Sequence, residues 1–332
     1  MANRRVVAAG LYRERSDFTD AYQRFSTGEI DNNLINFHAE RSEALKKAPP
    51  ENYAYKPPGE PLPFIYNLAQ FRGDNDKTRT ELYVGVSSSH LKFQFDRGRF
   101  HSRIDCVMLV RDTTFEDADR HTRNVNFEAA EYQNVENKLL MFQENLMLDP
   151  GSYSLSIEMD NEQGNTGTYT NPLQVKDFTD SKLMISDLQL ASDVVKASEP
   201  DEFTKSGLHV TPYPYTVIRK HAPVFVYFEI YNLRLDLTSQ TRFNVDYQIR
   251  LAERKRSLVA RTFRAIGRLF SGGREIGIST SYSQTGSRSW LPQYIALDMG
   301  SMPDGMAEFM VTITDQVANS KVSEKIEFQL IE

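Results

Sequence analysis

The chain has 332 residues, of which 40% are hydrophobic and 25% are charged, and its formal net charge is −6. This length exceeds one ordinary hydrophobic core, so two domains with an extension are expected. The small net charge excludes bulk adhesion to nucleic acid or anionic lipid, and no apolar run reaches the roughly 18 residues that a membrane span needs.

The first 60 residues show no strand-like alternation. Leu34, Phe37 and Leu45 recur loosely at helical spacing, and six prolines follow between residues 48 and 63. Proline is excluded from helix interiors and favours an extended connector. We therefore expect a helical extension and a proline-rich linker over residues 1–60.

From residue 61 the apolar pattern changes to a period of two, which predicts strands. The clearest alternation follows the turn at Pro150 and Gly151 and comprises Tyr153, Leu155, Ile157 and Met159. A return strand over 168–178 would complete an antiparallel hairpin. The single cysteine, Cys106, lies in the continuously apolar segment RIDCVMLV and is predicted to be a buried strand thiol.

The second half of the chain repeats this plan. When the two hairpins are aligned by their glycines, Leu155, Ile157 and Met159 coincide with three other apolar residues, Phe309, Val311 and Ile313. Segments starting at Tyr83 and Tyr227 also match, as do segments starting at Arg99 and Arg242. The pattern predicts a mainly β protein with two tandem immunoglobulin-like or fibronectin-like β-sandwich domains, over 61–177 and 178–332.

The segment VFVYFEIYN, residues 224–232, is apolar or aromatic on both of its alternating faces. Leaving either face in water would forfeit several burial contributions of about 1.5–3 kcal/mol each. We therefore expect a central strand of the second domain that is covered on both sides. Glu229 would then meet a cation or backbone donors near a sheet edge or a domain junction.

Residues 254–270 are predicted to form an inserted basic amphipathic helix in the second domain. Its apolar stripe comprises Val259, Phe263, Ile266 and Phe270. Its cations are Arg254, Lys255, Arg256, Arg261, Arg264 and Arg268. This helix could hold an acidic protein partner or lie on an anionic membrane surface. In the alternative interpretation, it covers the sandwich with its stripe and exposes its arginines to water.

The chemistry of the remaining residues argues against several functions. Nucleic acid is not favoured as a partner, because aromatic residues that could stack on bases are missing beside the basic helix. The six histidines are scattered, and neither a Gly-x-Ser-x-Gly elbow nor a phosphate-binding glycine loop occurs. We therefore assign no catalytic residue, metal site, cofactor or small-molecule substrate.

Tyr213 and Tyr215 lie in the stiff stretch TPYPY and form a second candidate interaction surface. Tyrosines beside prolines can provide a platform for a peptide or, together with Trp290, for a sugar. In the alternative interpretation, the rings cover a sheet edge. Trp290 is the only tryptophan, which weakens the case for a carbohydrate-binding module.

Several segments together resemble the carboxy-terminal β-rich part of bacterial proteins named for a Gly-Trp-x-Thr-Asp (GWxTD) domain. The segments are FIYNLAQFRGDNDKTRTELYVGV, LMISDLQLAS, GLHVTPYP and VFVYFEIYNLRLD, and the most specific parts are 186–188 and 229–233. The resemblance covers roughly residues 60–332 and implies an exported envelope protein of unassigned role. The Gly-Trp-x-Thr-Asp sequence itself is absent, so no catalytic residue is carried over.

The sequence thus predicts a non-enzymatic scaffold or protein-interaction module of a bacterial cell envelope. The alternatives are the accessory half of an enzyme whose catalytic part lies upstream or in a partner, and a glycan-binding module. The resemblance implies a periplasmic or other extracytoplasmic location. Because the apolar patch after Arg4 and Arg5 is too short for a secretory signal, the alternatives are a cytoplasmic chain or a start upstream of Met1.

Overall fold

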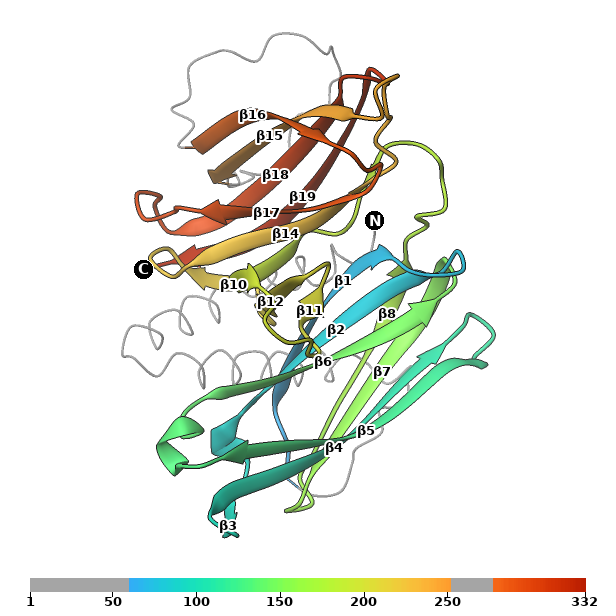
Figure 1. Ribbon diagram of the computed structural model, residues 1–332. Helices are drawn as coiled ribbons and strands as arrows, with labels where there is room; N and C mark the ends of the chain where they lie inside the picture. The colour runs from blue at the N-terminus through green and yellow to red at the C-terminus, as the bar shows by residue number, and fades with distance from the viewer. Residues whose placement is uncertain (1–59, 252–276) are drawn as a thin grey trace, which may run out of the picture. The chain divides into compact units, whose positions relative to one another are not determined.

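The structure is a computed structural model that describes residues 60–251 and 277–332. These residues form 19 β-strands in four sheets, with two short 3₁₀ turns and no α-helix among them (Figure 1). The prediction of a mainly β protein is confirmed. Apart from Glu60, the extension expected over 1–60 lies outside the described residues, and so does the whole helix expected over 254–270.

The chain divides into two compact units, unit 1 over Met1–Asp180 and unit 2 over Ser181–Glu332. In unit 1 one sheet has the strand order β1-β2-β6, and the other has the order β3-β4-β7-β8 with β5 paired to β4. The strands are β1 Phe64–Arg72, β2 Thr78–Ser87, β3 Gln94–Asp96, β4 Arg99–Arg111, β5 Asp117–Ala129, β6 Leu139–Leu148, β7 Gly151–Asn161 and β8 Thr166–Val175. The 3₁₀ turns η2 (Ser88–His90) and η3 (Tyr132–Asn134) both belong to this unit.

The two sheets of unit 1 share one hydrophobic core. Val84 of β2 and Cys106 of β4 are fully buried in it, so the predicted strand thiol is confirmed. Leu155, Ile157 and Met159 of β7 join the same core, as their alternation predicts. Because alternate residues of a strand point to opposite faces, this pattern fixes which face of each sheet turns inward.

Unit 2 also contains two main sheets. One has the strand order β11-β12-β10-β14-β17 with β9 paired to β14, and the other has the order β13-β19-β18-β15-β16. The strands are β9 Met184–Ile185, β10 Gln189–Lys196, β11 Thr204–Lys205, β12 Leu208–Pro212, β13 Val217–Arg219, β14 Val224–Tyr231, β15 Thr241–Leu251, β16 Gly277–Gly286, β17 Leu291–Leu297, β18 Gly305–Asp315 and β19 Ser320–Ile331.

Strand β14 is buried on both faces, as predicted from VFVYFEIYN. Val226 and Phe228 belong to the core that the two sheets of unit 2 share. Tyr227, Glu229 and Tyr231 point to the opposite face and are 0%, 2% and 0% exposed. A carboxylate buried to this degree requires hydrogen-bond donors, and these are described with the candidate site below.

The two units have the same strand connectivity. The sheets β1-β2-β6 and β5-β4-β7-β8 of unit 1 correspond to β10-β14-β17 and β16-β15-β18-β19 of unit 2. The last two strands of each unit form a long antiparallel hairpin, which is β7-β8 in unit 1 and β18-β19 in unit 2. The glycines that begin these hairpins, Gly151 and Gly305, therefore occupy the same place in the two units.

The strand registers correct one part of the sequence comparison. Cys106 lies opposite Met159 on β7, and Val245 lies opposite Ile313 on β18. Since Met159 and Ile313 occupy equivalent places, Cys106 corresponds to Val245, and the sequence match of Arg99 with Arg242 is displaced by four residues. A displacement by an even number keeps every side chain on its own face, so alternation alone could not detect it.

A buried Asx side chain ends the first strand of each terminal hairpin. In unit 1 the Asn161 side-chain oxygen accepts hydrogen bonds from the backbone N–H groups of Gln163 (3.0 Å) and Asn165 (2.9 Å). Its amide nitrogen donates to the carbonyl of His90, 3.1 Å away, in the connection that follows β2. The side chain thus fastens the hairpin turn to another loop.

Asp315 does the same in unit 2. One carboxylate oxygen accepts from the backbone N–H groups of Val317 (2.8 Å) and Ala318 (3.1 Å). The other oxygen accepts from the backbone N–H of Arg234, 2.7 Å away, in the connection after β14. Asp315 is fully buried, so its bonds are shielded from water.

We expect Asp315→Ala to lower the free energy of unfolding of unit 2 by about 2–3 kcal/mol, because buried backbone N–H groups would lose their acceptor. Chemical denaturation of the full chain measures this change. Asp236→Ala removes a similar turn at the surface, where water replaces the lost acceptor, and should cost much less. Equal losses for the two variants would contradict the assignment.

His121 connects the two sheets of unit 1 at their edges. It lies on β5, and its Nδ1 is 2.9 Å from the Glu144 carboxylate on β6, while its Nε2 is 3.2 Å from Asp119. Burial lowers the pKa of His121, but the hydrogen bond to Glu144 and the two carboxylate charges outweigh it and raise the pKa above its ordinary value. Arg123, which also approaches Glu144, is the nearby cation.

A histidine whose folded pKa is raised stabilises the fold below the unfolded pKa, and this contribution is lost as pH rises through the folded pKa. We expect this contribution to decline as the pH rises above about 6.5, the ordinary pKa of histidine, because the folded pKa lies higher. His121→Gln should remove the decline. Thermal unfolding of both proteins across this pH range measures the difference, and parallel curves would contradict it.

Candidate functional site

The most elaborate polar cluster of unit 2 surrounds Glu229 on β14. The hydroxyl of Tyr227 donates to one carboxylate oxygen at 2.9 Å, and the hydroxyl of Tyr231 donates to the other at 2.6 Å. Trp290 Nε1 donates to the same oxygen as Tyr231, at 3.2 Å. The two tyrosines flank Glu229 in the strand, so the period-two geometry of β14 places all three side chains on one face.

The connection before β10 is fastened to the backbone of Glu229. Ser186 N donates to the Glu229 carbonyl, and Glu229 N donates to Ser186 Oγ, both at 2.9 Å. The Ser186 hydroxyl in turn donates to the carbonyl of Asp187 at 2.7 Å. The parts of the sequence that carry the family resemblance most specifically, 186–188 and 229–233, therefore contact each other directly.

Lys205 continues this polar layer. Its Nζ donates to Gln189 Oε1 at 2.7 Å and lies 5.1 Å from the centre of the Tyr227 ring. Lys205 is only 7% exposed, so its ammonium is held by an amide oxygen and an aromatic face. Side chains of two tyrosines and a tryptophan donate hydrogen bonds to Glu229, and the sequence did not predict these three donors.

Unit 1 has a related cluster on the equivalent strand, β2. The hydroxyl of Tyr83 donates to Glu81 at 2.6 Å, and Arg79 forms a 3.1 Å ion pair with the same carboxylate. Arg79 also lies over the Phe71 ring, 5.2 Å from its centre. Because both units bury a carboxylate beside a tyrosine on the corresponding face, we interpret these clusters as parts of the packing.

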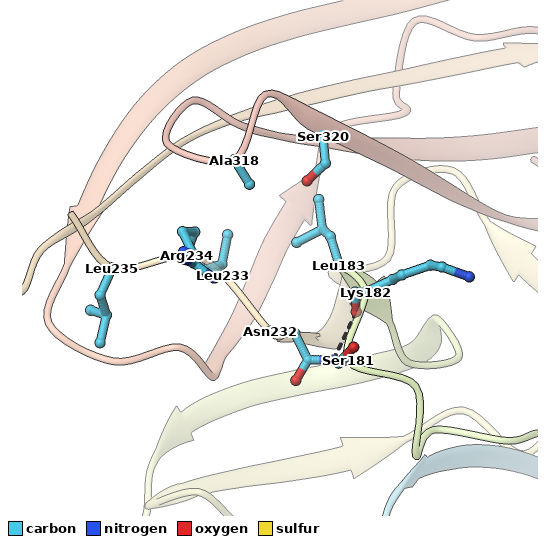
Figure 2. A pocket seen from close by; sticks show the side chains of 9 residues that line it. All are labelled: Ser181, Lys182, Leu183, Asn232, Leu233, Arg234, Leu235, Ala318 and Ser320. Carbon is cyan, nitrogen blue, oxygen red and sulfur yellow. Dashed lines mark hydrogen bonds between the residues drawn. The ribbon is translucent and has the colours of Figure 1, made fainter.

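A cavity of about 580 Å³ lies at one end of unit 2 (Figure 2). Three segments surround it: the start of the unit, the connection after β14 and the β18-β19 turn. Its lining residues are Ser181, Lys182, Leu183, Asn232, Leu233, Arg234, Leu235, Ala318 and Ser320. Asn232 joins two of the segments through its side-chain amide, which donates to the Lys182 carbonyl at 2.7 Å.

The lining combines apolar side chains with positive charge. Leucines contribute the apolar part and Arg234 contributes a cation, whereas the Lys182 ammonium points away from the other lining side chains (Figure 2). Among the described residues, no carboxylate forms an ion pair with the exposed Arg234. Leu235 of the lining is exposed, and Leu237, two residues further along the same connection, is completely exposed. An apolar surface rimmed by polar residues is typical of a protein interaction site.

The β14-β15 connection presents these leucines in a fixed conformation. Asp236 Oδ1 accepts from the backbone N–H of Thr238 at 2.8 Å and from that of Gln240 at 3.1 Å. The buried Asp315 holds the backbone of Arg234 on the other side of Leu235. Loops held by side-chain bonds of this kind present their tips at low entropic cost.

Unit 1 exposes aromatic rings at the corresponding end. Phe95 and Phe100 have ring centres 4.9 Å apart, and Phe100 lies 5.5 Å from Tyr132. Phe95 is 64% exposed. These residues lie in or beside the connections β2-β4 and β5-β6, which correspond to the connections that carry Leu237 and Trp290 in unit 2.

The candidate residues identified from the sequence do not form one site among the described residues. The six cations from Arg254 to Arg268 lie outside the described residues. Tyr213 and Tyr215 have ring centres 5.4 Å apart, and Tyr213 packs against the core of unit 2. Trp290 instead bonds to Glu229 on the opposite face of β14, so it does not join the two tyrosines in one platform.

Sequence reasoning did not identify the cavity. The sequence feature that could have indicated it is the segment NLRLDL. In this segment Leu233, Leu235 and Leu237 alternate as they would in a strand. Only Leu233 is buried, because the chain leaves β14 at Tyr231 and turns through Asn232, whose φ is 64°. Exposed leucines on a loop are the feature that distinguishes a binding surface from a core strand.

Comparisons of this chain with protein-family models and with curated proteins find no match.

We expect Glu229→Leu to lower the free energy of unfolding by about 3 kcal/mol, because two buried hydroxyls and the indole N–H would lose their shared acceptor. Trp290 is the only tryptophan, so its fluorescence reports this site directly and should shift as well. Tyr294→Phe on neighbouring β17 changes an exposed ring and serves as the control. An unchanged melting temperature and emission for Glu229→Leu would contradict this description.

Proposed function

We propose that this chain is a non-enzymatic protein-interaction module that consists of two tandem immunoglobulin-like or fibronectin-like β-sandwiches. Strand connectivity supports the sandwich assignment. If the main strands are named A, B, C, C′, E, F and G in chain order, both units have the sheets A-B-E and C′-C-F-G. Two such sheets around one core define a sandwich of this kind.

The cavity of unit 2 is the observation that carries the interaction proposal. It lies between the B-C connection, the F-G turn and the segment before strand A, at the sandwich end where loops commonly bind partners. Its leucines favour an apolar side chain of the partner, and Arg234 favours a neighbouring carboxylate. A protein segment with both features fits this surface best.

The location is proposed from the resemblance to the GWxTD-containing proteins. That resemblance supports a bacterial cell-envelope protein with a periplasmic or other extracytoplasmic location. The glycan alternative has less support, since Trp290 is engaged with Glu229 and lies apart from Tyr213. The accessory half of an enzyme remains the alternative, and it would use the same protein-binding surface.

We expect a photo-crosslinking residue in place of Leu237 to form a discrete adduct with a protein partner in living cells. Arg234→Glu in the same chain should weaken this adduct about tenfold or more, because it reverses the charge beside the cavity. Phe115 is the matched control position. It is also a highly exposed apolar residue, on the β4-β5 turn of unit 1, where Asp112 accepts from the backbone of Thr114 and Glu116 just as Asp236 does in its own turn.

Adducts of equal intensity from positions 237 and 115 would indicate random collision and would contradict the proposal. So would a specific adduct from position 237 that Arg234→Glu leaves unchanged, because the cavity would then not be part of the binding surface.

A further inference from the structure

Among the strands that the structure describes, β16 lies at an edge of its sheet, and it carries no charge. It spans ten residues with the sequence GISTSYSQTG, and the one described strand beside it is β15. The serines at 279, 281 and 283 and Thr285 have exposed side chains. In an antiparallel edge strand, every second residue directs its backbone N–H and C=O away from the sheet.

The equivalent strand of unit 1 is protected against such pairing. Strand β5 occupies the same place beside β4 that β16 occupies beside β15, yet its sequence DADRHTRNVNFEA carries charges along its length. The charges are Asp117, Asp119, Arg120, Arg123 and Glu128. Charged side chains are a common device by which proteins prevent edge strands from pairing with other chains.

The other long edge strands of the described residues are protected in different ways. Strands β8 and β17 contain Pro172 and Pro292, and proline removes a donor from the edge. The edge of β1 is tied to β8, since Tyr169 donates to the Phe64 carbonyl at 2.8 Å. Strand β6 is tied to β5 through His121 and Glu144. Within residues 60–251 and 277–332, none of these devices is found at strand β16.

We propose that β16 pairs in antiparallel fashion with β16 of a second copy of this chain, so that two sheets of unit 2 become one continuous sheet. A strand that pairs with itself about a two-fold axis places like residues near like residues. In β16 these are serine, threonine, glutamine and tyrosine, so no charges would repel. The hydroxyls of Ser281 and Ser283 already donate to Asp246 and Asn244 on β15, so the pairing of two copies rests on backbone hydrogen bonds.

The geometry favours a closed dimer rather than a fibre. The described strands of each chain include one such self-complementary edge. A two-fold contact occupies this edge in both copies, so a third copy cannot add to it. Core packing holds the strand in place for this contact, because Ile278 and Tyr282 pack against the core of unit 2. A single strand buries a modest area, so we expect a weak dimer whose population depends on concentration.

Sedimentation equilibrium of the full chain tests this proposal. We expect a monomer-dimer equilibrium, and we expect Ser281→Lys with Ser283→Lys to raise its dissociation constant about tenfold or more, since like charges would meet across the two-fold axis. The matched control is Ser152→Lys with Thr170→Lys, which adds the same charge at exposed strand positions of unit 1. The control should dimerise as the parent chain does.

Single cysteines at 279, 281, 283 and 285 provide an independent readout. Cys106 will not interfere, because burial raises its pKa to about 12 and keeps it from solvent. Near a two-fold axis, interchain disulfide yield should peak at one position and fall on both sides of it.

Each of four results would overturn the proposal: a monomer at all concentrations, a dimer insensitive to the lysines, higher oligomers, or equal disulfide yields at all four positions. A strictly monomeric chain would point instead to an extended segment of another protein as the strand that pairs with β16.

Discussion

The contact between the two sheets of each unit is the interaction on which the other features depend. In unit 1 it joins β2 to β4 and β7, and in unit 2 it joins β14 to β15 and β18, through side chains that are almost completely buried. Hydrophobic burial of this kind is the dominant favourable contribution to folding. It also fixes the ends of the strands, and with them the positions of the loops that surround the cavity and hold Leu237.

A second constraint follows from covering a central strand on both faces. Tyr227, Tyr231 and Trp290 donate hydrogen bonds to the buried Glu229 of strand β14, because an unpaired buried carboxylate would be strongly destabilising. The same principle explains the buried Asp315, which satisfies three backbone donors and links the hairpin turn to the cavity wall. Stability and the shape of the proposed binding surface therefore rest on the same side chain.

The two units differ at two pairs of equivalent places. Equivalent ends carry aromatic rings in unit 1 and a cationic, leucine-lined cavity in unit 2. Equivalent edge strands are charged in β5 and uncharged in β16. The connectivity that the two units share does not require either difference. We therefore interpret the differences as features of the two proposed surfaces: the loops at one end of unit 2, which would bind another protein, and the edge strand β16, which would pair with a second copy of the chain.

The sequence by itself determined the β class, the inward faces of β7 and β18, the burial of β14 on both faces, the burial of Cys106 and the hairpins that begin at Gly151 and Gly305, because alternation and turn chemistry are local properties. Only the tertiary structure decided that Cys106 corresponds to Val245, that Trp290 bonds to Glu229, that Leu237 is exposed although Leu233 is buried, and that β16 is an edge. Each of these depends on which distant segments pair. A period of two specifies the face of a side chain, but the register and the neighbours of a strand are selected by the packing of the whole unit.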